Sequence, residues 1–252
     1  MLNLLKLLLF LLQWAFNAGI VARIHALFFG LDRAYMRMLR TMVHMVECLG
    51  TRITSDQPKI EPYDLILANH QSWFDSIVGM RWTIDCGCPI MIVAKDMVRY
   101  LPINGWWIRK MKFPLISRTS KDRDQLNTIV TSNPVAIFPE GSRYTSLNHA
   151  RAKLFAAKNG IECGDRTILP RSGGAYTLMM NELRETIHIR TIVYNGGTEF
   201  PYRRLWPRSV DVTTRSYKRR DIPLATEAEF RDWLRARFLE MSVGGIPPGP
   251  PS

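Results

Sequence analysis

The sequence predicts an α/β fold: a mostly parallel open sheet flanked by helices, preceded by an N-terminal hydrophobic helical segment that attaches the chain to a membrane. Short β-branched runs alternate with longer segments that can form helices, as in a parallel sheet covered on its faces. The 252 residues are 46% hydrophobic and 22% charged, which excludes a disordered chain and a polytopic membrane protein. The length suits one domain of about 200 residues and an additional segment.

The N-terminal segment predicts the membrane attachment. Residues 7–22 carry no charge, and this run alone is short for a helix that crosses a bilayer. Residues 1–22 are just long enough, because Lys6 can snorkel toward the lipid headgroups. A second helical stretch follows at Asp32–Leu49. Three of its arginines favour a cytoplasmic location for the rest of the chain: Arg33, Arg37 and Arg40. A cleaved signal peptide is the competing interpretation, although no convincing cleavage site follows the apolar run.

From about residue 60 onward, short apolar runs predict strands and the segments between them predict helices. The predicted strands are Asp64–Ala68, Pro89–Ala94, Phe113–Ile116, Pro134–Phe138, Thr167–Leu169 and Ile187–Tyr194. The predicted helices are Trp73–Trp82, Lys121–Val130, Asn148–Asn159, Gly173–Leu183 and the amphipathic Glu227–Met241. We therefore divide the chain into hydrophobic N-terminal helices (residues 1–50), an α/β domain (residues 51–243) and a Pro/Gly-rich tail (residues 244–252).

The net charge of +12 and the pI of about 9.9 leave nucleic acid and an anionic membrane as polyanionic partners. A basic cluster spans Arg203–Arg220. Because it lacks an aromatic RNA-binding motif and the N-terminus is hydrophobic, an anionic lipid surface is the better partner and nucleic acid is not expected. The 4 cysteines show neither a disulfide framework nor zinc-ligand spacing, so we expect reduced thiols and no metal site.

Polar residues follow nearly every predicted strand. The carboxyl ends of parallel strands meet at one edge of an open sheet, where ligands bind. That edge gathers a histidine, a glutamate and several cations, which suits a phosphate-bearing substrate beside an acid/base group. The residues concerned are Asn69-His70, Lys95, Arg118, Glu140-Gly141-Ser142-Arg143 and Pro170-Arg171.

The first strand runs into the sequence NHQSWFD (residues 69–75). A histidine accepts a proton from a hydroxyl near neutral pH, and a carboxylate on its other ring nitrogen fixes the tautomer. The five-residue spacing across a strand-to-helix corner lets Asp75 fold back onto His70. Alternatively, Ser72 and Asp75 form a capping box for the following helix. Both interpretations can hold at once.

A second motif, FPEGSR (residues 138–143), ends the fourth strand. Gly141 permits a tight turn, and Arg143 beyond it can contact a phosphate through two hydrogen bonds. The alternative is an ordinary turn with a surface arginine.

Together, these motifs resemble the NHx4D and FPEGT/SR blocks of the glycerolipid acyltransferases, typified by 1-acyl-sn-glycerol-3-phosphate acyltransferase. Residues 101–118, with Gly105 and Arg118, look like the block between them, and TILPRSGG (residues 167–174) is similar to the fourth block. The resemblance covers roughly residues 60–200. The N-terminal hydrophobic region is shorter than in many relatives, which leaves the membrane topology open.

The resemblance implies transfer of a fatty acyl group from acyl-CoA or acyl carrier protein, as co-substrate, to the free hydroxyl of a lysophospholipid, with no other cofactor. His70 would be the general base and Asp75 its orienting partner, with the catalytic domain facing the cytoplasm. The residues expected to bind the substrate are Arg143, Glu140, Gly141, Arg118 and Lys95, with Arg171 a further candidate.

Two alternatives remain. A serine hydrolase would use Ser142 or Ser172 as nucleophile, but no G-x-S-x-G elbow is present. A non-catalytic membrane-associated lipid-binding protein would keep the fold and lose the reaction. The intact motif residues argue against that second alternative: His70, Asp75, Glu140 and Arg143.

Overall fold

The computed structural model describes residues 2–56, 58–116, 126, 131–165, 167–181, 183–195 and 207–242. Its centre is a six-stranded sheet with the order β1-β8-β7-β2-β6-β3, and a separate two-stranded sheet pairs β4 with β5. Every neighbouring pair is parallel except β7 and β8, which are antiparallel. The mostly parallel α/β fold predicted from the sequence is therefore confirmed.

The strands are β1 (Arg52–Ser55), β2 (Leu65–Ala68), β3 (Met91–Ile92), β4 (Ala94–Lys95), β5 (Leu115–Ile116), β6 (Val135–Ile137), β7 (Thr186–Asn195) and β8 (Ser209–Lys218). The α-helices are α1 (Leu2–Phe16), α2 (Ala22–Phe29), α3 (Leu31–Cys48), α4 (Asp75–Cys86), α5 (Asn104–Lys110), α7 (Ser146–Lys158), α8 (Ser172–Met179) and α9 (Glu227–Ser242).

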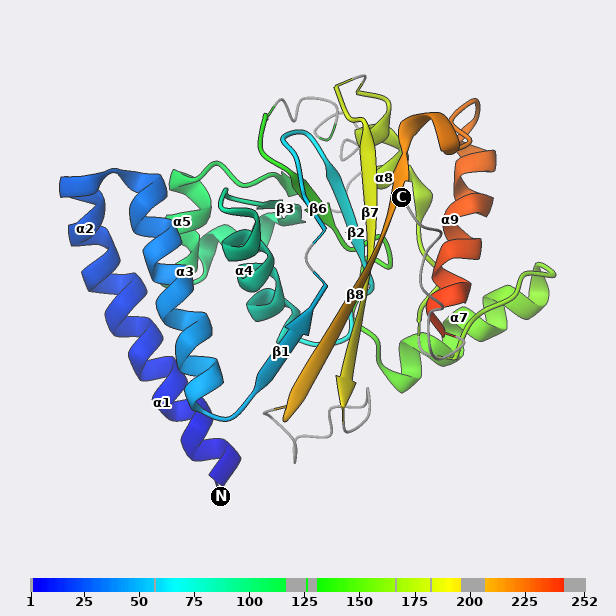
Figure 1. Ribbon diagram of the computed structural model, residues 1–252. Coiled ribbons are helices and arrows are strands. Elements are labelled where there is room, and N and C mark those ends of the chain that lie inside the picture. Colours follow the sequence, from blue (N-terminus) through cyan, green and yellow to red (C-terminus); the bar gives the residue numbers. More distant parts are fainter. Residues whose placement is uncertain are drawn as a thin grey trace.

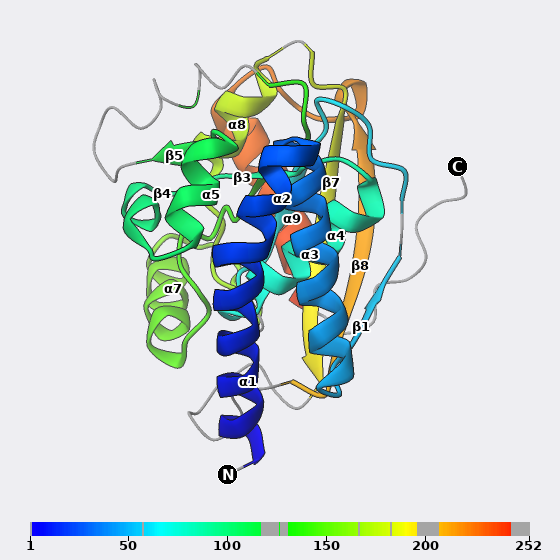
Figure 2. The same cartoon turned by 90° about the vertical axis from the view of Figure 1, so that its left-hand side faces the viewer.

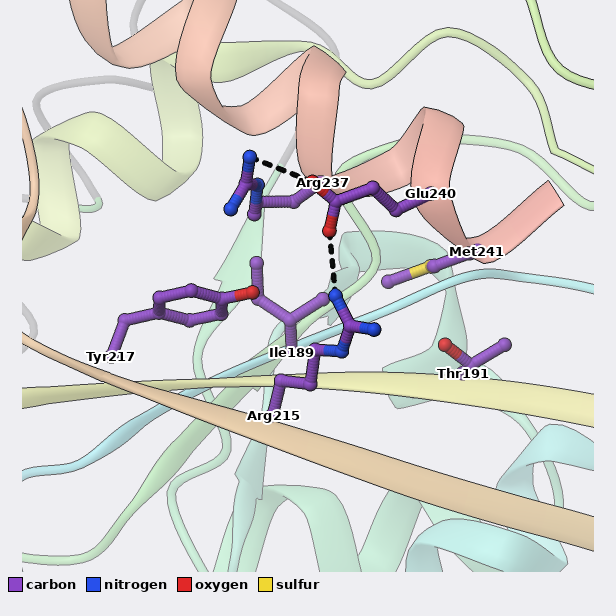
Figure 3. A pocket seen from close by; sticks show the side chains of 7 residues that line it. All are labelled: Ile189, Thr191, Arg215, Tyr217, Arg237, Glu240 and Met241. Atoms are coloured by element: carbon purple, nitrogen blue, oxygen red, sulfur yellow. Dashed lines mark hydrogen bonds and ion pairs between the residues drawn. The ribbon is translucent and has the colours of Figure 1, made fainter. Parts of the chain in front are cut away.

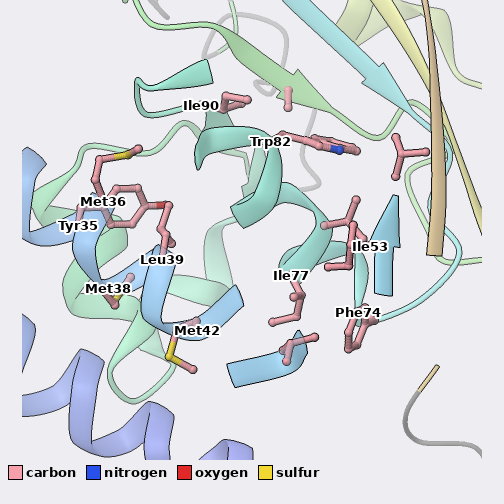
Figure 4. Packing of buried hydrophobic residues seen from close by; sticks show 14 of the residues in the cluster. Tyr35, Met36, Met38, Leu39, Met42, Ile53, Phe74, Ile77, Trp82 and Ile90 are labelled. Atoms are coloured by element: carbon pink, nitrogen blue, oxygen red, sulfur yellow. The ribbon is translucent and has the colours of Figure 1, made fainter. Parts of the chain in front are cut away.

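Helices cover both faces of the sheet (Figure 1). Successive residues of β2 alternate between two cores. Ile66 and Ala68 join the core beneath α3 and α4, whereas Leu65 and Leu67 join the core beneath α8 and α9. Figure 4 shows part of the first core, with Met36, Met38 and Met42 of α3 on one side and Phe74, Ile77 and Trp82 of α4 and its N-terminal turn on the other.

The N-terminal segment forms one long helix and a return helix. A five-residue π-helical stretch, Asn17–Val21, joins α1 to α2, and Gly30, with φ of 87°, turns the chain into α3. The indole of Trp107 on α5 donates a 3.0 Å hydrogen bond to the carbonyl of Ala18, which fastens the π-helical stretch to the body. Segment Leu5–Phe29 is long and apolar enough to cross a membrane, judged by length and composition.

The outer face of this long helix is apolar and exposed. Eleven large hydrophobic side chains between positions 5 and 29 are more than 40% exposed. The next helix, α3, instead buries Met42, Val46 and other apolar residues against α4. The predicted division of the chain at residue 50 remains a prediction.

Several predicted elements differ in the structure. Pro89–Ala94 is divided into β3 and β4, which belong to different sheets, and Phe113–Ile116 pairs with β4 instead of joining the main sheet. Thr167–Leu169 forms no strand; the amide of Ile168 donates instead to the side chain of Glu140. Helix Lys121–Val130 and the tail lie outside the described residues, except Leu126.

Candidate active site

His70 and Asp75 meet at the carboxyl end of β2. The Nδ1 atom of His70 lies 2.7 Å from Oδ2 of Asp75. Asp75 is only 1% exposed, so little water reaches its carboxylate. Its negative charge is stabilised by hydrogen-bond donors of the protein instead. The contact places a hydrogen on Nδ1 and leaves the lone pair of Nε2 for a substrate proton. The side chain of His70 remains 25% exposed, so the ring is accessible.

The turn before α4 also supplies backbone donors to Asp75. The amides of Gln71 and Ser72 donate to Oδ2 at 2.7 and 2.9 Å, and Ser72 Oγ accepts from the amide of Phe74 at 3.2 Å. The reach of Asp75 back to Ser72 is one half of a capping box. Asp75 therefore stabilises the start of the helix and orients the histidine at the same time.

A third side chain completes the arrangement. Tyr194, near the end of β7, donates its hydroxyl hydrogen to Oδ1 of Asp75. Burial raises the pKa of Tyr194 well above its ordinary value, and the adjacent Asp75 charge raises the pKa further, so the hydroxyl keeps its hydrogen. The sequence interpretation missed this residue, although it stands at the same carboxyl edge as His70, where β7 runs parallel to β2.

Glu140 joins three segments of the site beneath the surface. One carboxylate oxygen accepts from the amide of His70 at 2.5 Å, and the other accepts from the amide of Ile168 at 2.8 Å. Burial raises the pKa of Glu140 to about 8, against the lowering effect of the two amides. Since its oxygens are engaged in this way, Glu140 positions the backbone of His70.

The FPEGSR loop lies against the histidine. The ring of Phe138 stacks on His70 with 4.5 Å between centroids, and the amide of Tyr144 donates to the carbonyl of His70 at 2.7 Å. Gly141 has φ of 68°, a left-handed conformation that favours glycine. The loop thus presents Arg143, which is exposed, next to the base.

Arg171 approaches the same loop from the fourth sequence block. Its amide donates to the carbonyl of Pro139 at 2.8 Å, and its side chain passes within about 4 Å of the Cβ position of Gly141. By contrast, Lys95 is exposed on β4, in the small sheet. Arg118 lies outside the described residues. Both remain predicted substrate-binding residues.

Gly105, in the block between the two motifs, allows a close backbone approach. A Cβ atom at that position would lie 2.0 Å from the carbonyl oxygen of Arg99, so a larger residue would force the start of α5 to move.

The candidate serine nucleophile Ser172 is buried, and its hydroxyl donates to Glu227 at 3.2 Å. No group of three or more His, Cys, Asp or Glu residues suited to a metal ion occurs among the described residues.

Part of the basic cluster at Arg203–Arg220 makes contacts within the fold, and the predicted contact of the cluster with an anionic lipid surface remains a prediction. Arg219 donates to carbonyls at the end of α8, including those of Met179 and Asn181. Arg215 pairs with Glu240 at 2.7 Å. Arg203 lies outside the described part of the chain.

A small pocket lies between β7, β8 and α9 (Figure 3). Its lining includes Ile189 and Thr191, which alternate along β7 with Tyr194 and therefore point to the opposite face of the sheet. Glu240 pairs there with Arg237 at 2.7 Å as well as with Arg215. The pocket is separate from the His70 site.

Comparison with known proteins gives the family of the chain. The family model described as Acyltransferase matches residues 52–195. The chain belongs to this acyltransferase family. The resemblance to glycerolipid acyltransferases predicted from the two motifs is confirmed.

Individual relatives are distant. A probable 1-acyl-sn-glycerol-3-phosphate acyltransferase 5 of Arabidopsis thaliana is 28% identical over 65% of this chain and 48% of its own length. A 2-acyl-1-lysophosphatidylinositol acyltransferase of Saccharomyces cerevisiae is 23% identical over 80% of this chain and 70% of its own. Lysocardiolipin acyltransferase 1 of mouse is 26% identical over 59% and 44%. The chain thus spans about half the length of several relatives.

The fold is shared with a solved structure. The crystal structure of the 1-acyl-sn-glycerophosphate (LPA) acyltransferase PlsC from Thermotoga maritima matches with a TM-score of 0.61, covering 95% of each chain at 14% identity. This likeness includes the N-terminal helices and confirms the architecture.

Proposed function

We propose that this protein transfers a fatty acyl group from a thioester, either acyl-CoA or acyl carrier protein, to the free hydroxyl of a lysophospholipid such as lysophosphatidic acid. The observation that carries the proposal is the His70–Asp75 pair, with its 2.7 Å contact through Nδ1 and an accessible ring. Membership of the acyltransferase family supports the reaction class, and the names of its relatives support a lysophospholipid acceptor.

The chemistry follows from the free nitrogen of the base. Nε2 of His70 takes the proton of the acceptor hydroxyl as the oxygen forms a bond to the thioester carbonyl carbon. The carbon–sulfur bond then breaks, and the thiolate takes the proton back from the imidazolium. The products are an ester and a free thiol. Asp75 holds the imidazolium in place and balances its charge.

This route needs no acyl-enzyme. Ser72, the serine nearest to His70 in sequence, is buried and its oxygen accepts from the amide of Phe74, which suits a helix cap. Arg143, with Arg171 beside the loop, supplies positive charge for the acceptor phosphate, because a guanidinium fits phosphate oxygens through two parallel hydrogen bonds. Lys95 and Arg118 are proposed as second cations for the same acceptor phosphate.

We also place the protein on a membrane, with its catalytic domain facing the cytoplasm. The exposed apolar face of Leu5–Phe29 suits a lipid environment. Arg33, Arg37 and Arg40 are exposed on α3, and clustered cations near a membrane segment favour the cytoplasmic side. An anionic membrane attracts the same positive charge.

The test is thiol release from acyl-CoA by the purified full chain, with and without lysophospholipid. Acceptor-dependent release, with the new ester identified by mass spectrometry, is the expected result. Release without acceptor would indicate a hydrolase, and binding of lipid without release would indicate a non-catalytic lipid-binding protein. A matrix of acceptor head groups against acyl donors of varied length then defines the substrate.

A further inference from the structure

Helix α7 has a buried face and an exposed apolar face. Ala152 and Ala156 pack inward. On the other side, Leu147, Leu154 and Phe155 are 61%, 73% and 53% exposed. Spacings of seven and eight residues place these three side chains on one stripe of a helix. A water-exposed stripe of this kind marks an interaction surface.

Cations lie within the same stripe. Arg151 and Lys158 stand between the apolar residues on the helical wheel, both are exposed, and the sequence of α7 contains no Asp or Glu. Lys153, on a different side, pairs with Asp165 at 2.7 Å. An apolar stripe with interleaved cations and no acidic residue is typical of a helix that lies in the interface of an anionic bilayer.

The helix is attached directly to the candidate site. It begins at Ser146, three residues after Arg143. The Thr145 hydroxyl accepts from the amide of Asn148 at 3.1 Å, and the Asn148 side chain donates to the carbonyl of Arg143 at 3.1 Å. His149 contacts the carbonyl of Gly164 at 2.8 Å, close to the segment that Glu140 holds. The position of α7 therefore fixes the position of the arginine loop.

The placement of α7 agrees with that of the N-terminal helix. Figures 1 and 2 both show α7 and the first half of α1 toward the same end of the molecule, the end to which the arrow of β7 points. His70 follows β2, which is parallel to β7, so the site opens toward this end as well.

We infer that α7 is a second membrane-contacting element, which docks its Leu147–Leu154–Phe155 stripe onto an anionic lipid surface and holds the arginine loop at the headgroups. An acidic carrier protein could be attracted by the same cations. The bilayer is favoured because α1, whose first half lies toward the same end, also exposes an apolar face that suits lipid better than water.

Site-specific photo-crosslinking tests this inference in the full chain reconstituted with phosphatidylcholine vesicles that contain phosphatidylglycerol. A benzophenone amino acid replaces Leu154 on α7. In separate chains it replaces Leu12 on α1, a positive control that is 69% exposed, and Leu183, a control that is 55% exposed at the amino end of β7. Lipid adducts are expected at positions 12 and 154 and not at position 183.

Adducts at position 12 without adducts at position 154 would overturn the inference, as would crosslinking of position 154 to added acyl carrier protein in place of lipid. The lipid charge is tested separately by combining the probe at position 154 with Arg151→Gln and Lys158→Gln. Each change should lower the adduct yield on anionic vesicles by about fivefold, and equal yields would refute the role of the cations. The crosslinking does not require acyl transfer, so its result can be interpreted even if the acyltransferase proposal fails.

Discussion

Replacing Tyr194 by Phe removes one hydroxyl from the centre of the candidate site. That hydroxyl donates to Oδ1 of Asp75, whereas His70 and the amides of Gln71 and Ser72 approach Oδ2. The ring of Tyr194 is buried and packs edge-on against Phe74 at 6.3 Å, so phenylalanine fits the same space. The substitution therefore tests the hydrogen bond with little change in packing.

The expected magnitude follows from the strength of a hydrogen bond to a charged group, about 1.5–3 kcal/mol. If the transition state loses this stabilisation, because Asp75 then balances the imidazolium charge less well, kcat falls by roughly 10- to 100-fold. The acceptor KM should stay near the wild-type value, because the hydroxyl contacts Asp75 and is placed to position the base, not to bind the substrate.

The assay is acceptor-dependent thiol release measured over a range of acceptor concentrations for the wild type and the variant. Tyr35→Phe is a matched control, because Tyr35 is buried between the rings of Trp107 and Phe113, away from Asp75. It should leave kcat unchanged. A Tyr194→Phe variant with wild-type kcat would refute the positioning role of Tyr194.

Three further predictions concern the FPEGSR loop. Burial raises the pKa of Glu140 from 4.5 to about 8, so the folded state keeps a proton that the unfolded chain releases between these values. The free energy of unfolding should therefore fall by up to about 1.4 kcal/mol per pH unit as pH rises through this window, and Glu140→Gln should remove that slope in urea titrations. A pH-independent difference from the wild type would contradict this. Arg143→Ala should raise the acceptor KM more than it lowers kcat, with Arg220→Ala as a control that leaves both unchanged; an unaltered KM would exclude Arg143 from the phosphate site. Gly141→Ala places a side chain at φ of 68° and should cost about 1 kcal/mol of stability, and an unchanged unfolding midpoint would show that the turn relaxes freely.

Much of the fold could be predicted because its signals are local. The apolar run of β2 and the amphipathic stripe of α9 each report their own secondary structure. The sequence pattern does not predict β8 (Ser209–Lys218), because this strand lies within a run of basic residues that is typical of a charged surface segment. Thr167–Leu169 has three apolar or β-branched residues, which predict a strand, but the Ile168 amide donates to the Glu140 side chain, a long-range contact that no local pattern reports.

The part of the candidate site that is local in the sequence could also be predicted. His70 and Asp75 are five residues apart, so a turn of the chain alone brings them together. Tyr194 and Glu140 are joined to this pair only by the pairing of β7, β2 and β6. Their roles required the order of strands in the sheet, which the sequence pattern does not specify.

The measurement that tests the central claim most directly is acyl transfer by His70→Ala. General-base catalysis contributes typically 10²- to 10⁴-fold, so the variant should lose at least about 99% of acceptor-dependent thiol release. Circular dichroism should show that it still folds, and flotation should show that it still binds vesicles. A folded variant that retained more than about a tenth of the wild-type rate would contradict the assignment of His70 as the base.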